Sequence, residues 1–366
     1  MTRREKIGQL FMLGFSGTSV SAELAGLLAE YRPGGVIVFA RNLQSPKQIA
    51  ALTNDLQKLS AHSPLLIAID QEGGRVSRLP KEFTIFPACA LLGQCGSAEL
   101  AYDVAAGTAK ELRAVGINMN MAPVLDVDTN PRNPIIGDRA FSGNAEQVAE
   151  MGLATMAGLH DHKVLACGKH FPGHGDTSAD SHKELPIVTA SVERLREVEL
   201  RPFRHAIDHG LATIMTAHVS YPHLDAHYPA TLSSTILTKL LREELGFRGL
   251  IITDDLEMHA IIDHYGMGEA AVQAFTAGAD MLLICKEYDR AVAAMEALYR
   301  AASDGVLSEV RIEASLRRIA QVKERFLFPY TPVDPQTAKQ VVGSPAHQAL
   351  LETVRRGGRS PNPAHS

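Results

Sequence analysis

The sequence predicts an α/β fold, a (β/α)8 TIM-type barrel built as a single domain. Three observations predict it: eight short apolar segments recur along the 366 residues, helical patterns separate most of them, and polar side chains follow several of their ends. Continuous apolar strands indicate a sheet that is buried on both faces, which is typical of parallel sheets. Regular alternation with helices then favours a barrel, which usually needs ~250 residues or more.

The predicted strands are rich in branched residues and are bounded by glycine, proline or polar residues. They are Leu10–Gly14, Gly35–Phe39, Leu65–Asp70, Met119–Pro123, Val164–Lys169, Thr213–His218, Leu250–Thr253 and Met281–Ile284. The predicted helices are Ala22–Glu30, Pro46–Lys58, Ala98–Val115, Ala145–His160, Ser191–His209, Ser234–Leu245, Glu269–Ala277 and Glu309–Arg325. A doubly wound sheet is the alternative architecture, but no GxGxxG motif follows a strand to support a dinucleotide site.

The barrel is expected to occupy residues 1–330, and residues 331–366 form a C-terminal extension. Thr331–Gln336 contains two prolines, whereas Ala346–Val354 has the pattern of one more helix. The last ten residues, Gly357–Ser366, are small and polar and are expected to be disordered.

Composition and charge exclude several classes of protein. The net charge is -5 and no cluster of Lys and Arg precedes the tail, so no nucleic-acid partner is expected. No stretch approaches ~20 apolar residues, so no membrane span is expected, and Leu10–Phe15 is too short for the core of a signal peptide. The four cysteines form no CxxC pair, which is typical of reduced thiols in a cytoplasmic protein.

Polar residues gather at one end of the predicted strands. Asp70, Asp126, His170, His218 and Asp254 each lie at or just past the C-terminal end of a strand. In a barrel of this type, that rim is where catalytic residues lie. The pattern therefore predicts an enzyme.

The segment 169–182, KHFPGHGDTSADSH, holds three histidines, two aspartates and a lysine. Its proline and glycines indicate a loop that can move. Asp180 and His182 are two residues apart, so in an extended stretch their side chains share a face. A carboxylate beside an imidazole fixes its tautomer and raises its pKa, and such a pair can transfer protons near neutral pH. The alternative is a solvated polar loop.

Two adjacent acids, Asp254 and Asp255, follow the apolar segment Leu250–Thr253. One carboxylate can point into the barrel mouth, stabilise an oxocarbenium-like transition state and bond to the anomeric carbon of a sugar. The other can turn outward and cap the next helix. From the spacing alone, it is equally possible that both acids are only caps.

Arginines accompany two further acids. In the segment 70–78, Asp70 is followed by two glycines, Arg75 and Arg78, which could bind sugar hydroxyls or form an internal salt-bridge cluster. In GDRAFS, Arg139 is a candidate ligand donor, although a surface arginine is the commoner arrangement.

Together, the motifs KHFPGHGDTSADSH, TDDLEM, DQEGGRV and GDRAFS resemble those of the bacterial β-N-acetylhexosaminidases of glycoside hydrolase family 3. The resemblance covers Glu5 to Phe328, and the long loop motif is the most specific. Many relatives in the wider family carry a second α/β domain, whereas this chain resembles the single-domain type. The resemblance implies release of terminal β-N-acetylglucosamine from 1,6-anhydro-muropeptides during cytoplasmic peptidoglycan recycling.

The resemblance also implies roles for individual residues. Asp254 matches the nucleophile of a retaining mechanism, His182 the general acid/base, and Asp180 the partner that orients it. The residues that match the binding site of the terminal sugar are Asp70, Arg78, Arg139, Lys169, His170 and, with less support, His218. Glu257 departs from the family pattern, in which a small polar residue is common at this position.

No cofactor or metal is expected, and the only partner implied is a small sugar substrate containing N-acetylglucosamine. The oligomeric state does not follow from the sequence, and a monomer is the working expectation. Three alternatives stay open: a β-glucosidase, β-xylosidase or glycoside phosphorylase of the same family, a metal-dependent barrel hydrolase, and a non-catalytic sugar-binding protein. No HExxH motif supports the metal-dependent alternative.

Overall fold

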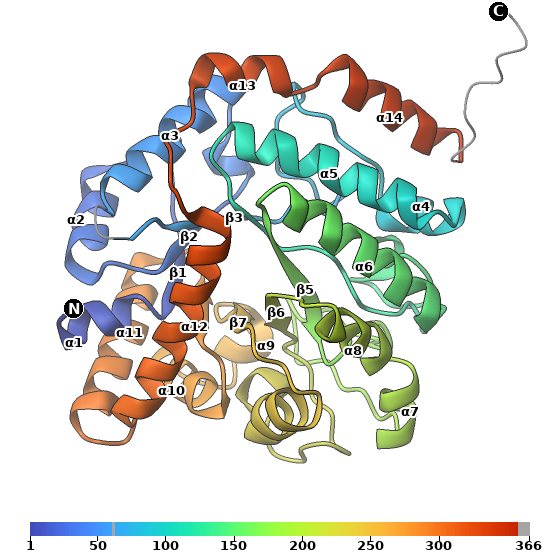
Figure 1. Ribbon diagram of the computed structural model, residues 1–366. Coiled ribbons are helices and arrows are strands. Elements are labelled where there is room, and N and C mark those ends of the chain that lie inside the picture. Colours follow the sequence, from blue (N-terminus) through green and yellow to red (C-terminus); the bar gives the residue numbers. More distant parts are fainter. Residues whose placement is uncertain (61–62, 358–366) are drawn as a thin grey trace, which may run out of the picture.

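The computed structural model describes residues 1–60 and 63–357, and its strands close into a parallel barrel in the order of the sequence (Figure 1). The strands are β1 (Phe11–Gly14), β2 (Gly35–Val38), β3 (Leu66–Ile69), β4 (Met119–Asn120), β5 (Leu165–Phe171), β6 (Thr213–Thr216), β7 (Leu250–Asp255) and β8 (Met281–Ile284). Met12 of β1 is paired with Gly35 of β2 and with Leu283 of β8, which closes the sheet. The predicted barrel is confirmed, and the doubly wound alternative is wrong.

Helices surround the barrel. They are α1 (Arg3–Gly8), α2 (Ala22–Tyr31), α3 (Pro46–Lys58), α4 (Cys89–Cys95), α5 (Ala98–Ala114), α6 (Ala145–Asp161), α7 (Val192–Glu197), α8 (Leu200–Asp208), α9 (His259–Ile262), α10 (Met267–Ala277), α11 (Tyr288–Ser303), α12 (Glu309–Leu327), α13 (Pro335–Val341) and α14 (Pro345–Arg355), with the short η1 (Ala40–Asn42), η2 (Gly137–Arg139) and η3 (Ala230–Leu232) and the π-helix η4 (Thr235–Glu244). Serine caps fix many starts: the side chain of Ser97, for example, accepts the N–H of Leu100.

The elements differ from the prediction where proline or a short segment intervenes. The helix predicted at Ser191–His209 is two helices, because Pro202 has no N–H to donate to the carbonyl of Val198. The strand predicted at Met119–Pro123 ends at Asn120, whose side-chain amide bonds to the backbone of Gln71 instead. Helices α1, α4, α9, α11 and α13 were not predicted.

Residues beyond the barrel pack on its outside. Helix α13 contacts α3 and α5, and α14 contacts α5 and α4, so both lie across one side of the molecule (Figure 1). The buried carboxylate of Glu111 on α5 lies 2.7 Å from Nδ1 of His347 on α14 and also accepts the N–H of Gly343. The disorder predicted for Gly357–Ser366 falls, apart from Gly357 itself, outside the described residues.

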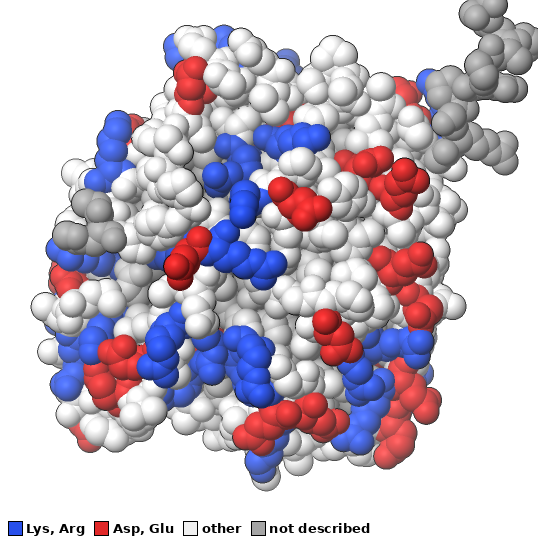
Figure 2. All heavy atoms as spheres, viewed as in Figure 1, with Lys and Arg blue, Asp and Glu red and all other residues white. Residues whose placement is uncertain are grey.

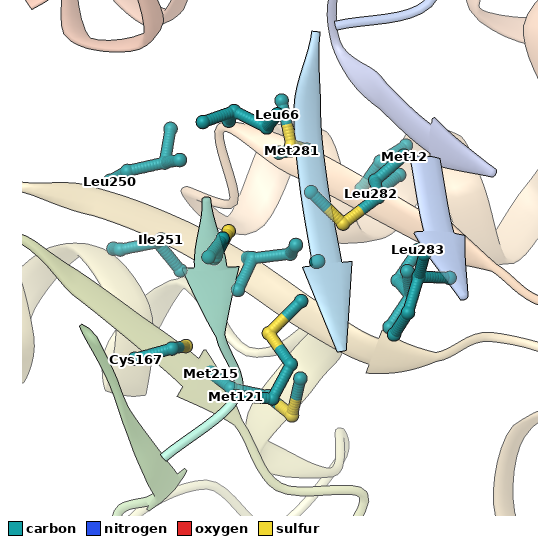
Figure 3. Close-up of a cluster of buried hydrophobic side chains, with 14 of the residues drawn as sticks. Met12, Leu66, Met121, Cys167, Met215, Leu250, Ile251, Met281, Leu282 and Leu283 are labelled. Carbon is teal, nitrogen blue, oxygen red and sulfur yellow. The ribbon is translucent and has the colours of Figure 1, made fainter. Parts of the chain in front are cut away.

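Buried methionine, leucine and isoleucine side chains from β1, β3, β6, β7 and β8 pack together in the core (Figure 3). Met12 and Leu66 meet above Gly35, where a Cβ atom would lie 2.9 Å from each of them. At the C-terminal end of the barrel, Met215 and Leu283 contribute apolar surface to the lining of a cavity. The core thus ends directly beneath the charged rim.

Charge is unevenly distributed on the surface, and Lys and Arg side chains gather near the middle of the face seen in Figure 2. Just before β8, the buried carboxylate of Asp280 pairs with Arg242, Arg311 and Arg318. In the described parts of the chain, no helix is long and apolar enough to cross a membrane.

Candidate active site

A cavity of about 480 Å³ opens at the C-terminal ends of the strands, which lies within the ~300–1,000 Å³ typical of ligand pockets. Seven of the nine predicted site residues line it: Asp70, Arg78, Arg139, Lys169, His170, His182 and Asp254. Asp180 does not line the cavity but contacts His182, and His218 is fully buried behind its wall. Segments far apart in the sequence therefore meet at one site.

The floor of the cavity carries a buried ion cluster. Lys169 on β5 donates from Nζ to Asp70 at 2.7 Å and to Glu72 at 2.6 Å. Arg139 donates to both oxygens of Glu72 at 2.8 Å, in the bidentate geometry that arginine favours. Burial raises the cost of the charged form of Glu72, but the two cations outweigh it and hold its pKa well below the usual range. The cluster fixes rigid donors and acceptors for a polar ligand.

His170 is held in place by a second buried acid. Its Nδ1 lies 2.7 Å from Asp126 Oδ2, and its backbone N–H donates to Asp126 Oδ1. Burial opposes ionisation of Asp126, yet contact with His170 lowers its pKa below the usual value. The other ring nitrogen, Nε2, lies 3.4 Å from a terminal nitrogen of Arg139. His170 therefore contacts the ion cluster on the cavity floor.

The adjacent acids at the end of β7 have different environments. Asp254 faces the cavity and accepts the N–H of Asp255 at 2.8 Å. Burial opposes its ionisation, but the nearby His218 and His170 and this N–H outweigh burial and lower the pKa of Asp254. Burial, reinforced by Glu257 and Asp254, raises the pKa of Asp255 to about 7. The two neighbouring acids are therefore shifted in opposite directions, with the pKa of Asp254 lowered and that of Asp255 raised.

The loop after β5 is anchored in its first half. A Cβ atom at Gly175 would lie 1.7 Å from the carbonyl oxygen of Val127, so only glycine allows this close approach. Asn133 donates to the carbonyls of His174 and Gly175, and burial lowers the pKa of His174 to about 4. The base of the loop is thus fixed against the barrel rim.

The second half of the loop carries His182 into the cavity. Nδ1 of His182 lies 3.0 Å from Asp180 Oδ1, and the same oxygen accepts the backbone N–H of His182. Burial opposes ionisation of Asp180, but these bonds lower its pKa below the ordinary value. The His182 side chain is 59% exposed, so its Nε2 is open to a ligand or to solvent.

His218 supports the site from below. Its Nδ1 lies 2.7 Å from Thr231 Oγ1 and its Nε2 lies 2.9 Å from the carbonyl oxygen of Asp255. With both ring nitrogens occupied, it cannot also bind a ligand without rearrangement. Burial lowers the pKa of His218, and the ring positions the end of β7.

Two acids organise the floor without having been predicted as site residues: Glu72 was not singled out, and Asp126 was placed at the rim without a role of its own. Glu72 follows Asp70 by two residues, and in an extended segment such residues share a face, which is the signal that could have found it. Arg41 and Lys286 also line the cavity without having been predicted. Among the described residues, no group of three or more His, Cys, Asp or Glu is placed to hold a metal ion.

Comparisons with known proteins agree with this geometry. Residues 2–322 match the family model described as glycosyl hydrolase family 3 N terminal domain. Beta-hexosaminidase A of Pseudoalteromonas piscicida is 36% identical over 96% of this chain, which spans 65% of that protein's length. Beta-hexosaminidase of Nitrosomonas eutropha is 40% identical, with 87% of this chain and 93% of that protein covered.

Solved structures are similar as well. The glycoside hydrolase family 3 beta-N-acetylglucosaminidase from Paenibacillus sp. FPU-7 has a TM-score of 0.92 and 44% identity, covering 99% of this chain and 70% of that one. NagZ from Neisseria gonorrhoeae, in complex with N-trifluoroacetyl-D-glucosamine, has a TM-score of 0.77 and 32% identity, covering 96% and 98%.

The barrel and its cavity of acids, imidazoles and charged donors define a glycoside hydrolase. The chain belongs to glycosyl hydrolase family 3. The family membership predicted from the four motifs is confirmed.

Proposed function

We propose that this β-N-acetylhexosaminidase releases terminal β-N-acetylglucosamine with retention of configuration, and that 1,6-anhydro-muropeptides of peptidoglycan recycling are its substrates. The single observation that carries the proposal is that Asp254 and His182, from different elements, line one cavity whose floor is an ion cluster. The relatives named beta-hexosaminidase and beta-N-acetylglucosaminidase support the choice of sugar. The free state of all four cysteines, each in the described part of the chain, supports action in the cytoplasm.

The terminal sugar sits on the cavity floor in this proposal. Asp70, Lys169 and Arg139 bind its hydroxyl groups through charge-assisted hydrogen bonds, and His170 and Arg78 complete the contacts. Because these side chains hold one another in place, little order must be gained when the sugar binds.

In the first step, an oxygen of Asp254 bonds to C1 while the bond from C1 to the leaving oxygen breaks. The protonated ring of His182 gives its Nε2 proton to that oxygen, with Asp180 holding Nδ1. In the second step, neutral His182 takes a proton from water, whose oxygen attacks C1 and frees Asp254. The lowered pKa of Asp254 keeps this acid ionised as a nucleophile at neutral pH.

The experiment that tests the proposal traps the covalent intermediate. A 5-fluoro glycosyl fluoride of N-acetylglucosamine should label the wild type, and peptide mass spectrometry should place the sugar on Asp254. Asp254→Asn should lose the label, whereas Asp255→Asn should keep it. A label on Asp255, or no label despite turnover, would overturn the assignment of the nucleophile.

A parallel assay tests the reaction itself. Release of an aryl alcohol from its β-N-acetylglucosaminide should not depend on phosphate or on a chelator. A rate that rises with phosphate, with sugar phosphate as product, would indicate a phosphorylase. Loss of the rate in a chelator would indicate a metal-dependent hydrolase.

A further inference from the structure

Three cations that line the cavity lack a carboxylate partner: in the part of the chain that the structure describes, Arg41, Arg78 and Lys286 form no ion pair. Lys169 and Arg139, in contrast, are neutralised by Asp70 and Glu72. Arg78 is only half-buried and belongs to the proposed sugar site. Arg41 and Lys286 are exposed, so they stand at the mouth of the cavity and not on its floor.

Arg41 is held rigidly at this mouth. Its Nε donates to the carbonyl oxygen of Phe15 at 2.9 Å, and one terminal nitrogen donates to the carbonyl oxygen of Cys285 at 2.5 Å. The guanidinium carbon also lies 4.5 Å from the centre of the Phe39 ring. Carbonyl oxygens orient the guanidinium without cancelling its charge, and its other terminal nitrogen has no acceptor within residues 1–60 and 63–357.

Lys286 follows Cys285, whose carbonyl oxygen accepts a hydrogen bond from Arg41, and Lys286 lines the same cavity. Its backbone N–H donates to the buried Glu257, which also accepts the N–H groups of Cys285 and Glu287, so the start of this loop is fixed. The Lys286 side chain itself is exposed at the cavity mouth and forms no ion pair within the described residues.

We propose that Arg41 and Lys286 form a binding site for a carboxylate on the aglycone, the part of the substrate that leaves. The inference rests on the proposed function, since a terminal sugar seated on the floor makes its aglycone leave through the mouth. Two uncompensated cations, one of them rigid, favour an anionic over a neutral group there. The site would then select substrates by charge while the floor selects the sugar.

The test compares two disaccharides that differ in one carboxylate. N-acetylglucosamine β-1,4-linked to N-acetylmuramic acid carries a lactyl carboxylate, and the same compound with that group converted to the amide is neutral. We expect the ratio of kcat/KM, acid over amide, to fall about three- to tenfold in Arg41→Gln and in Lys286→Gln, and further in the double variant. The wild-type ratio should also fall as ionic strength rises.

Arg75→Gln is the matched control. Arg75 lines the same cavity, but it is already paired with Asp138 at 2.8 Å, so its loss should leave the acid-to-amide ratio within about twofold. An unchanged ratio in the double variant, or equal losses on the acid and the amide, would overturn the anion site. Failure of the proposed function is separate, because then neither disaccharide nor a neutral aryl glycoside would be cleaved.

Discussion

The Nδ1 atom of His182 lies 3.0 Å from the Oδ1 atom of Asp180, yet the imidazole itself remains largely exposed. A catalytic acid in a glycosidase is usually a buried carboxylic acid whose pKa is raised by its surroundings. Here a carboxylate two residues away orients an exposed imidazole, a group that can both give and take a proton. The couple can therefore lie on a loop while the nucleophile is fixed at the end of a strand.

The first prediction concerns His182→Ala. With a poor leaving group such as a sugar, kcat should fall by ~10²–10⁴, because the leaving oxygen then departs without a proton. With a 2,4-dinitrophenyl leaving group, which needs no proton, the glycosylation step should be nearly unchanged. Stopped-flow measurement of aryl alcohol release across a leaving-group series checks this. Equal losses on all leaving groups would contradict an acid role.

The second prediction concerns the floor of the cavity. Glu72→Gln should lower the free energy of unfolding by about 3–5 kcal/mol, because it leaves Lys169 and Arg139 buried with too little negative charge. Urea denaturation followed by circular dichroism measures the loss. Glu244→Gln removes an acid from an exposed pair with Arg196 and should cost less than about 1 kcal/mol. Similar losses in the free energy of unfolding for Glu72→Gln and Glu244→Gln would show that the buried charges of the floor are not tightly coupled.

Much of this site was predictable because strand ends in a parallel barrel converge, so Asp70, His170 and Asp254 had to share a rim. Glu72 was not assigned a role because its importance comes from Lys169 and Arg139, whose separation in sequence hides their contact. The position of His218 at a strand end was predictable, but its role was not. Only the structure shows that Thr231 and the carbonyl of Asp255 hydrogen-bond to its two ring nitrogens.

The fold shows the same division. Strands were predictable from apolar runs, since burial on both faces leaves a continuous signal, as in Leu250–Thr253. Helix α11 (Tyr288–Ser303) was missed because four of its five buried positions, apart from Leu298, are alanine or methionine, which mark a helix face weakly. The break between α7 and α8 was missed because the effect of Pro202 on the preceding turn, at Val198, was not considered.

The third prediction concerns Asp255, whose pKa burial raises from 3.8 to about 7. The folded state holds this proton more tightly than the unfolded chain, so the free energy of unfolding falls as pH rises from about 4 to 7. Asp255→Asn removes the titration but keeps the oxygen that accepts the N–H of Glu257. The Tm of Asp255→Asn minus the Tm of the wild type should therefore be several degrees higher at pH 8 than at pH 5. Differential scanning calorimetry at both pH values measures this difference. A Tm difference between variant and wild type that is the same at pH 5 and pH 8 would contradict this prediction.

The fourth prediction concerns Lys323 on α12, which is 2% exposed. Among the described residues, its ammonium group hydrogen-bonds to the neutral Gln9 and Ser63, at 3.3 and 3.4 Å, and forms no ion pair. Burial lowers its pKa from 10.5 to about 7, so the folded state releases the proton first and stability rises with pH across that interval. Lys323→Met should raise the free energy of unfolding by about 1–3 kcal/mol at pH 7, and by much less near pH 10.

A control for Lys323 is the exposed Lys47, where substitution by Met should change stability little at either pH. Chemical denaturation of the wild type and both variants at pH 7 and pH 10 gives the change in free energy of unfolding for each substitution at each pH. A gain for Lys323→Met that is the same at both values would show that its ammonium group is not responsible.

The pairing of β1 with β8 also constrains how the molecule is made. The strand Phe11–Gly14 leaves the ribosome early, but its partner Met281–Ile284 is translated only after most of the chain. Until then the growing sheet has an open edge on the β1 side, which exposes backbone donors and acceptors to other chains. Nascent molecules stalled before β8 should therefore be held by chaperones, and release should coincide with the appearance of β8.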